Sequence, residues 1–132
     1  VQCNLSRSAD KYTLRGLHYQ IDEAAEDKLV RCTKGALLDI IIDIRPDSPT
    51  YCQHIAVELT EKNHKMLYVP RGFAHSFITL EEDTEVFYMV TNFYNSEKER
   101  GIRWNDPTFD IEWPTDNPVL SPKDANHPDF IK

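Results

Sequence analysis

The feature that most limits how this chain can fold is a series of short strand-forming runs between Lys28 and Asn92. The runs are separated by turn-forming residues, and they read KLVRCTK, ALLDIIIDIR, CQHIAVEL, MLYVP, FAHSFITL and TEVFYMVTN. Short strands at this spacing, without a long helical period between them, are typical of an all-β sandwich or barrel. The sequence therefore predicts an all-β fold with strands mainly at 28–92.

The segment from 95 to 132 has a different composition, rich in Pro, Asp and Asn. It predicts a cover of loop and short helix lying on the sheets, in which SPKDA resembles a capped helical turn. The chain has 132 residues and is 40% hydrophobic, which is enough for one domain, 1–132, with a buried core.

Charge and apolar patterning exclude several classes of function. The net charge is -7, and no basic face is concentrated anywhere, so we expect no nucleic-acid partner. No apolar run approaches the roughly 20 residues of a membrane span, and the N-terminus VQCNLSRSAD lacks the order of a signal peptide. The three cysteines show no CxxC spacing and are expected to be reduced thiols, which together predicts a cytoplasmic protein without a membrane partner.

Alternation along the strands places polar groups on faces that would turn inward. Asp39 shares a face with Leu37 and Ile41. Tyr88 shares a face with two valines, and His75 shares a face with Phe77. Burying such groups is costly unless they are paired or take part in chemistry. The interior is therefore predicted to hold titratable side chains.

The stretch LRGLHYQ, at 14–20, places His18 just before the first strand of the series. On spacing alone His18 can be a half-buried histidine bonded to backbone, a metal ligand or a general base. A metal is disfavoured because Gln20 and Phe77 stand where a two-histidine strand motif would carry its second histidine. We expect no metal and no cofactor. Gly16 is expected to allow a close approach of backbone to substrate.

Each of the other candidates also has an ordinary structural explanation. Lys28 can be a solvated lysine that balances the acidic stretch before it, and Arg15 can be a surface cation or a clamp for phosphate or carboxylate. Tyr88 can be a half-buried strand aromatic, and Asp124 can be a helix-start residue. Taken singly, none of these residues assigns a function.

Taken together, the motifs resemble one family. The stretches RGLHYQ, KLVRCTKG, DIRPDSPT, VPRGFAHSF, FYMVTNFY, ERGIRWNDPTFDIEWP and LSPKD are similar, in order and spacing, to dTDP-4-dehydrorhamnose 3,5-epimerases, from about Val1 to Asp124. The resemblance implies a cupin-like jelly-roll barrel that needs no metal, forms a homodimer and acts on a nucleotide-linked 4-keto-6-deoxyhexose.

The resemblance also implies roles for particular residues. His18 would be the base, and Asp124 would pair with its imidazole. Tyr88 would donate a proton from the other side of the sugar ring, and Lys28 would stabilise the oxygen charge that develops at C4. Arg15 would bind the diphosphate or the same oxygen.

Four further positions follow from the same comparison. Asp39 and His75 match pocket positions and would shape the charge around His18, whereas Gln2 and Asn4 would contact the nucleotide. The chain departs from the family pattern in carrying Cys3 between those last two residues and Ser76 after the pocket histidine. Family members usually continue upstream of VQCNLS, so the chain is either truncated or a shortened relative.

The resemblance leaves three hypotheses open. The first is an isomerase that inverts C3 and C5 of dTDP-4-dehydro-6-deoxy-D-glucose. The second is an enzyme that inverts only one of these centres or takes a GDP- or CDP-linked sugar. The third is a non-catalytic barrel that binds sugar nucleotides, although a pure binder has no need of a base and an acid on opposite walls.

Overall fold

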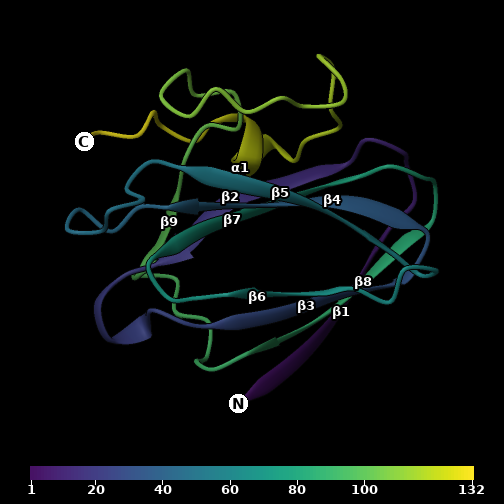
Figure 1. The fold of residues 1–132 in the computed structure, drawn as a ribbon, viewed down its shortest axis with the longest axis horizontal. Coiled ribbons are helices and arrows are strands. Elements are labelled where there is room, and N and C mark those ends of the chain that lie inside the picture. The colour runs from purple at the N-terminus through teal and green to yellow at the C-terminus, as the bar shows by residue number, and fades with distance from the viewer.

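The computed structural model describes residues 1–132, and it consists of two antiparallel sheets that face each other (Figure 1). The four-stranded sheet has the order β1 (Gln2–Ser8), β8 (Thr84–Val90), β3 (Lys28–Lys34) and β6 (Met66–Val69). The five-stranded sheet has the order β5 (His54–Thr60), β4 (Ala36–Asp43), β7 (Phe73–Thr79), β2 (Leu14–Gln20) and β9 (Glu99–Gly101). A 3-10 turn at Asp22–Ala24 and helix α1 (Pro122–Ala125) are the only helical elements. The prediction of an all-β fold is confirmed.

The strands extend beyond the expected range of 28–92. Strands β1 and β2 precede it, β9 follows it, and His18 lies inside β2 rather than before the first strand. Strand β1 was missed because QCNLSRS is polar and lies at a sheet edge, where only one neighbour pairs with it. Strand β2 was missed because a glycine interrupts its pattern.

The core has two parts, which lie on opposite faces of the five-stranded sheet. Between the sheets, Leu37 and Ile41 of β4 pack with residues such as Val30 and Val86 of the other sheet. On the outer face, Ile40 and Ile42 of the same strand pack with Ile102 and Phe109 of the C-terminal segment. Both faces of β4 are therefore buried, which explains its nearly continuous apolar run.

The C-terminal segment lies on the outside of the five-stranded sheet (Figure 1). Its helix α1 begins at Ser121, whose hydroxyl accepts a hydrogen bond from the backbone N–H of Asp124 at 3.1 Å, and Pro122 follows at the start of the helix. The capped turn expected from SPKDA is confirmed. This cap fixes Asp124 against β2, where its side chain is buried.

The α-helix of this structure has neither the length nor the apolar character needed to cross a lipid bilayer.

Candidate active site

An irregularity in β2 places Arg15 and His18 on one face of the strand. Residues three apart in a regular strand point to opposite sides of the sheet. Here the pairing of β2 with β7 shifts register between Arg15 and His18, and both residues line one cavity between the sheets. The shift thus brings a cation and an imidazole into the same cavity.

Gly16 makes this irregularity possible. Its φ is +124°, and a Cβ added there would lie 2.7 Å from the carbonyl oxygen of His75 and 2.8 Å from the Cβ of Ser76. Gly16 therefore allows a close approach of β2 to strand β7, and its expected close approach to substrate stays a prediction. The backbone N–H of Gly16 also donates to Asp124 Oδ2 at 3.3 Å.

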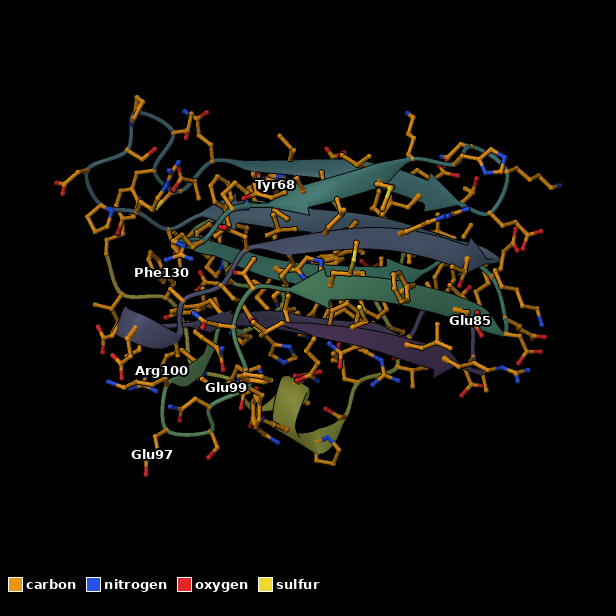
Figure 2. All side chains as sticks on the ribbon, turned by 90° about the horizontal axis from the view of Figure 1, so that it is seen from below. Tyr68, Glu85, Glu97, Glu99, Arg100 and Phe130 are labelled. Carbon is orange, nitrogen blue, oxygen red and sulfur yellow. The ribbon has the colours of Figure 1, made fainter.

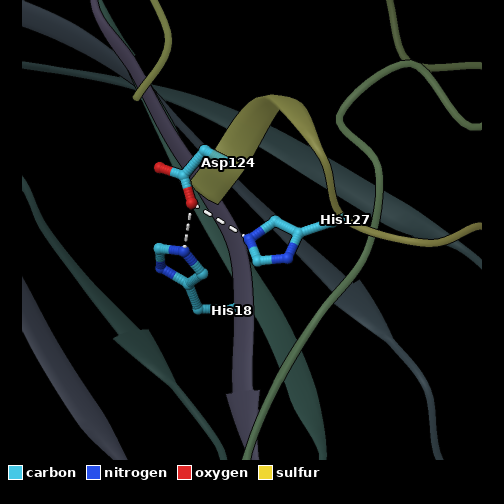
Figure 3. A group of neighbouring side chains, drawn as sticks. All are labelled: His18, Asp124 and His127. Atoms are coloured by element: carbon cyan, nitrogen blue, oxygen red, sulfur yellow. Dashed lines mark hydrogen bonds and ion pairs between the residues drawn. The ribbon is translucent and has the colours of Figure 1, made fainter. Parts of the chain in front are cut away.

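The carboxylate of Asp124 holds the imidazole of His18 (Figure 3). Nε2 of His18 lies 2.6 Å from Asp124 Oδ1, so Nε2 carries the proton of this bond and Nδ1 is the nitrogen with a free lone pair. Burial opposes ionisation of Asp124, but the hydrogen bond and charge of His18, with bonds from His127 and Gly16, lower its pKa to about 2. Asp124 is therefore ionised at neutral pH and stabilises a proton on His18.

The opposite wall of the site is the four-stranded sheet. Inward-facing residues of β1, β3 and β8 meet His18 in a cavity of about 250 Å³, and they are Gln2, Asn4, Lys28 and Tyr88. A second cavity of about 210 Å³ is lined by Arg15, His18, Lys28, His75 and Tyr88. His18, Lys28 and Tyr88 line both cavities, so the imidazole faces the amine and the phenol across the space between the sheets.

Lys28 is the buried cation of this wall. Burial lowers the pKa of Lys28, while the charges of Glu26 and Asp39 act in the opposite direction. Its Nζ lies 3.6 Å from Glu26 Oε1, and both side chains are largely buried. Burial in turn raises the pKa of Glu26. An ammonium group at this position would strongly stabilise a developing oxyanion.

Tyr88 presents a neutral hydroxyl to the cavity. Burial raises the pKa of Tyr88, and the nearby charge of Glu26 raises it further, although Arg15 acts in the opposite direction. A protonated phenol at neutral pH is a proton donor. Because Tyr88 lies on the four-stranded sheet and His18 on the five-stranded sheet, a sugar ring held between them would meet one group on each face.

A second histidine–aspartate pair lies beside the first. His75 is the direct cross-strand neighbour of His18, and its Nε2 lies 2.5 Å from Asp39 Oδ1. Asp39 is fully buried, and its Oδ2 has no hydrogen-bond partner. Asp39 lines neither cavity, so it can act on a bound molecule only through His75 or through its charge.

The structure adds three residues that the sequence did not single out. Glu26 and Glu99 line the 250 Å³ cavity, and His127 contacts Asp124 with Nε2 3.0 Å from Oδ1. Glu26 lies in the irregular loop before β3, and Glu99 lies in the short strand β9. Neither segment is long enough to show an alternating pattern from which inward-facing residues could be predicted. The motif that contains Asp124 ends before His127, which explains its omission.

His18, Asp124 and His127 also bring three potential metal-binding atoms within 4.8 Å of one another. Both imidazole Nε2 atoms point to the same carboxylate oxygen, at 2.6 and 3.0 Å, which is hydrogen-bond spacing (Figure 3). A cation would have to displace both bonds. The cluster is therefore held together by hydrogen bonds, and the expectation that no metal is needed stays a prediction.

Comparison with known proteins gives the family. A family model described as dTDP-4-dehydrorhamnose 3,5-epimerase matches residues 1–132. The dTDP-4-dehydrorhamnose 3,5-epimerase of Shigella flexneri is 47% identical over 131 residues, which are 99% of this chain and 72% of that protein. This chain belongs to the dTDP-4-dehydrorhamnose 3,5-epimerase family. The resemblance inferred from the motifs is confirmed, and the family is one of isomerases.

Solved structures of family members agree closely with the fold. The crystal structure of the epimerase from Bacillus anthracis with TDP and PPi bound has a TM-score of 0.97 at 44% identity, covering 98% of this chain and 74% of that one. The epimerase from Legionella pneumophila in complex with dTDP-4-keto-L-rhamnose has a TM-score of 0.92 at 41% identity, covering 98% and 68%. The cupin-like jelly-roll prediction is thereby confirmed.

Proposed function

We propose that this protein is an epimerase that inverts C3 and C5 of dTDP-4-dehydro-6-deoxy-D-glucose to give dTDP-4-dehydro-L-rhamnose. The observation that carries the proposal is the His18–Asp124 pair on one wall of a cavity whose other wall holds Lys28 and Tyr88. The family to which the chain belongs supports the substrate, since the Legionella relative is in complex with dTDP-4-keto-L-rhamnose.

The proposed chemistry uses the ketone at C4 of the sugar. The ketone acidifies the hydrogens at C3 and C5, so His18 can remove one of them as a general base. The resulting enolate carries its charge on the C4 oxygen, where the ammonium group of Lys28 stabilises it. Tyr88 then returns a proton to the opposite face of the same carbon, and the centre is inverted. Asp124 stabilises the imidazolium while the proton is on His18.

The remaining predicted residues are assigned to anchoring of the substrate. Arg15 is assigned to the anionic oxygens of the diphosphate, which a guanidinium can bind through two parallel hydrogen bonds. Gln2 and Asn4, whose side chains are bonded to each other at 2.7 Å, are assigned to the nucleotide. His75 and Asp39 are assigned to the charge balance around His18. The proposal needs no cofactor.

The proposal is tested by incubating the protein with dTDP-4-keto-6-deoxyglucose in deuterated water and following deuterium at C3 and C5. We expect incorporation at both carbons, together with formation of the L-configured product. Incorporation at C3 alone would replace the proposal with a single-centre epimerase. Substrate binding without incorporation at either carbon would favour the non-catalytic barrel, and the same assay with GDP- and CDP-linked sugars tests the nucleotide.

We also propose that the protein is a homodimer, which associates through the outer face of the four-stranded sheet (Figure 2). Two cross-strand rows of this face are largely apolar, and they are Leu5, Phe87, Arg31, Met66 and Cys3, Met89, Leu29, Tyr68. Leu5 is 63% exposed, and Tyr68 is 55% exposed. An apolar sheet face of this extent supports association with a partner, because a solvated face normally alternates with polar residues.

Light scattering after size exclusion tests the dimer. We expect twice the chain mass of 15.4 kDa for the wild type and one chain mass for Leu5→Glu/Tyr68→Glu. The matched control is Ile55→Glu, an equally exposed apolar position on the other sheet, which should stay dimeric. A monomeric wild type would contradict the proposal.

Finally, we propose a cytoplasmic location. The three cysteines are free, and Cys3 is exposed, which is compatible with a reducing compartment. Cell fractionation that found the protein outside the cytoplasm would contradict this.

A further inference from the structure

His127 contacts the carboxylate that holds the proposed base. Its Nε2 lies 3.0 Å from Asp124 Oδ1, the same oxygen that lies 2.6 Å from His18 Nε2. The rings of His18 and His127 stand nearly perpendicular, with centroids 5.5 Å apart. Two imidazoles therefore donate to one oxygen, and the backbone N–H of Gly16 occupies the other (Figure 3).

The position of His127 is fixed by strand β9. Gly101 lies directly opposite His18 in the pairing of β2 with β9. A Cβ on Gly101 would lie only 2.1 Å from His127 Nδ1, so the histidine ring occupies the space that a side chain at residue 101 would fill. The φ of Gly101 does not require glycine, so this packing accounts for the glycine. The side chain of His127 is 10% exposed, and its ring is held in place.

Sharing one oxygen between two donors weakens each bond. If Asp124 Oδ1 accepted a hydrogen bond from His18 alone, its negative charge would attract the His18 proton more strongly and favour the protonated imidazole. A second donor to the same oxygen reduces this attraction. A positive charge on the His127 ring would also repel a positive charge on the His18 ring. Both effects act in the same direction, and they favour a His18 that keeps its lone pair. A base works best when its proton affinity matches the pH at which it operates.

We propose that His127 is a positioning residue for the base: through Asp124 Oδ1 it limits how strongly His18 holds a proton. The inference rests on the proposed function, in which His18 removes the proton from the sugar. It assigns His127 no contact with substrate. His127 does line a separate cavity of about 850 Å³, whose other lining residues include Tyr94 and Glu99 of the 250 Å³ cavity.

Other charges surround the cluster and remain in every variant used to test it. The charged groups that share the cavities of His18 are Glu26 in the loop before β3, Lys28 at the start of β3 and Glu99 of β9, together with Arg15 of β2 and His75 of β7; the titratable tyrosines there are Tyr19, Tyr88 and Tyr94. The groups around His127 are Glu99 and Arg100 of β9, Lys123 of α1 and Asp129 of the C-terminal segment. Because these groups stay constant, a difference between variants at position 127 reports the bond to Asp124.

The test compares the pH dependence of kcat/KM for deuterium exchange in three proteins. His127→Phe keeps an aromatic ring against Gly101 but removes the donor, and His127→Gln keeps an N–H at the position of Nε2. We expect the acid limb of His127→Phe to move to higher pH by about half a unit to one unit, since a hydrogen bond worth about 1 kcal/mol corresponds to this shift. The acid limb of His127→Gln should stay at the wild-type pH.

A second readout separates this proposal from the proposed function. The ring of His18 can be titrated by NMR in protein without substrate, and we expect its midpoint to move upward in His127→Phe and in Gly101→Ala, whose new Cβ displaces the His127 ring. If the protein does not act on the sugar, this shift still tests the role of His127. An unmoved midpoint in His127→Phe, or a rate loss that is equal at all pH values, would overturn the proposal and leave His127 a purely structural residue.

Discussion

The two histidine–aspartate pairs lie side by side, yet their surroundings differ. His18 and His75 are cross-strand neighbours, and each bonds an aspartate through Nε2 at 2.6 and 2.5 Å. The side chain of His18 is 32% exposed, whereas that of His75 is 11% exposed. The two pairs are thus alike in their central bond and unlike in their access to a substrate.

The two carboxylates differ as well. Both oxygens of Asp124 accept hydrogen bonds, whereas Asp39 has one oxygen that is buried without a partner. Asp124 comes from the C-terminal cover, and Asp39 lies on the strand next to its histidine. A bond between His and Asp therefore does not by itself identify a base. The His18–Asp124 pair is the more exposed of the two, and both of its carboxylate oxygens are bonded. The Asp39 carboxylate lies in the interior, where its charge opposes the lowering of the Lys28 pKa by burial.

The largest difference between the pairs should appear when each aspartate becomes asparagine. In Asp124→Asn the N–H of Gly16 still needs an oxygen, so the amide NH₂ turns to His18 and holds the tautomer whose lone pair faces Asn. We expect kcat to fall by roughly 10²- to 10⁴-fold. Asp39→Asn should lower kcat less than about tenfold, because His75 is not the base. Equal losses in steady-state assays would remove the distinction.

Replacement of Tyr88 by phenylalanine tests which group faces His18 from the far side. Tyr88 lies on the opposite sheet, whereas His75 shares a sheet with His18. We therefore expect Tyr88→Phe to keep some deuterium exchange but to form little inverted product, because deuterium can still return from the side of His18. His75→Asn should keep the ratio of inversion to exchange. The opposite pattern in these two variants would make His75 the donor.

The buried His75–Asp39 pair is expected to affect the pH dependence of kcat/KM at alkaline pH. Burial lowers the pKa of Lys28, and the charge of Asp39 partly offsets this effect. Asp39→Asn should therefore lower the pKa of Lys28 further, so that the charged amine is lost at lower pH. The alkaline limb of kcat/KM should move down by about half a unit or less. Asp47→Asn, in an exposed loop, is the control. An unmoved limb would show that Asp39 does not support Lys28.

The smallest expected effect is on stability in acid. The pKa of Asp124 is lowered to about 2, so its ionised form stabilises the fold above pH 4, and this contribution is lost as the pH falls toward 2. Asp124→Asn should therefore show a weaker loss of unfolding free energy between pH 4 and 2 than the wild type or Asp47→Asn. Urea unfolding at several pH values measures this slope. A slope equal to that of wild type would mean that ionisation of Asp124 does not contribute to the pH dependence of the unfolding free energy.

Much of this site could be predicted from local sequence patterns. Alternation correctly placed Asp39 and Tyr88 toward the interior, and SPKDA correctly predicted a capped turn. The partnership of His18 with Asp124 could not be derived in this way, because 106 residues separate them and strand periodicity says nothing about the cover. It came only from the family resemblance.

Two further features depend on packing that no local pattern encodes. A regular strand would put Arg15 and His18 on opposite faces, and only the irregular register against β7 brings them together. His127 meets Asp124 because Gly101 leaves room for its ring, and the two residues are brought together only by the fold.

In the proposed function His18, and not its neighbour His75, removes the proton from the sugar. The most direct measurement is the rate of deuterium incorporation at C3 and C5 in His18→Asn and His75→Asn, with dTDP binding measured in both as a control for folding. We expect no detectable incorporation at either carbon in His18→Asn and readily measured incorporation at both in His75→Asn. Incorporation at the wild-type rate in His18→Asn would show that His18 is not the base.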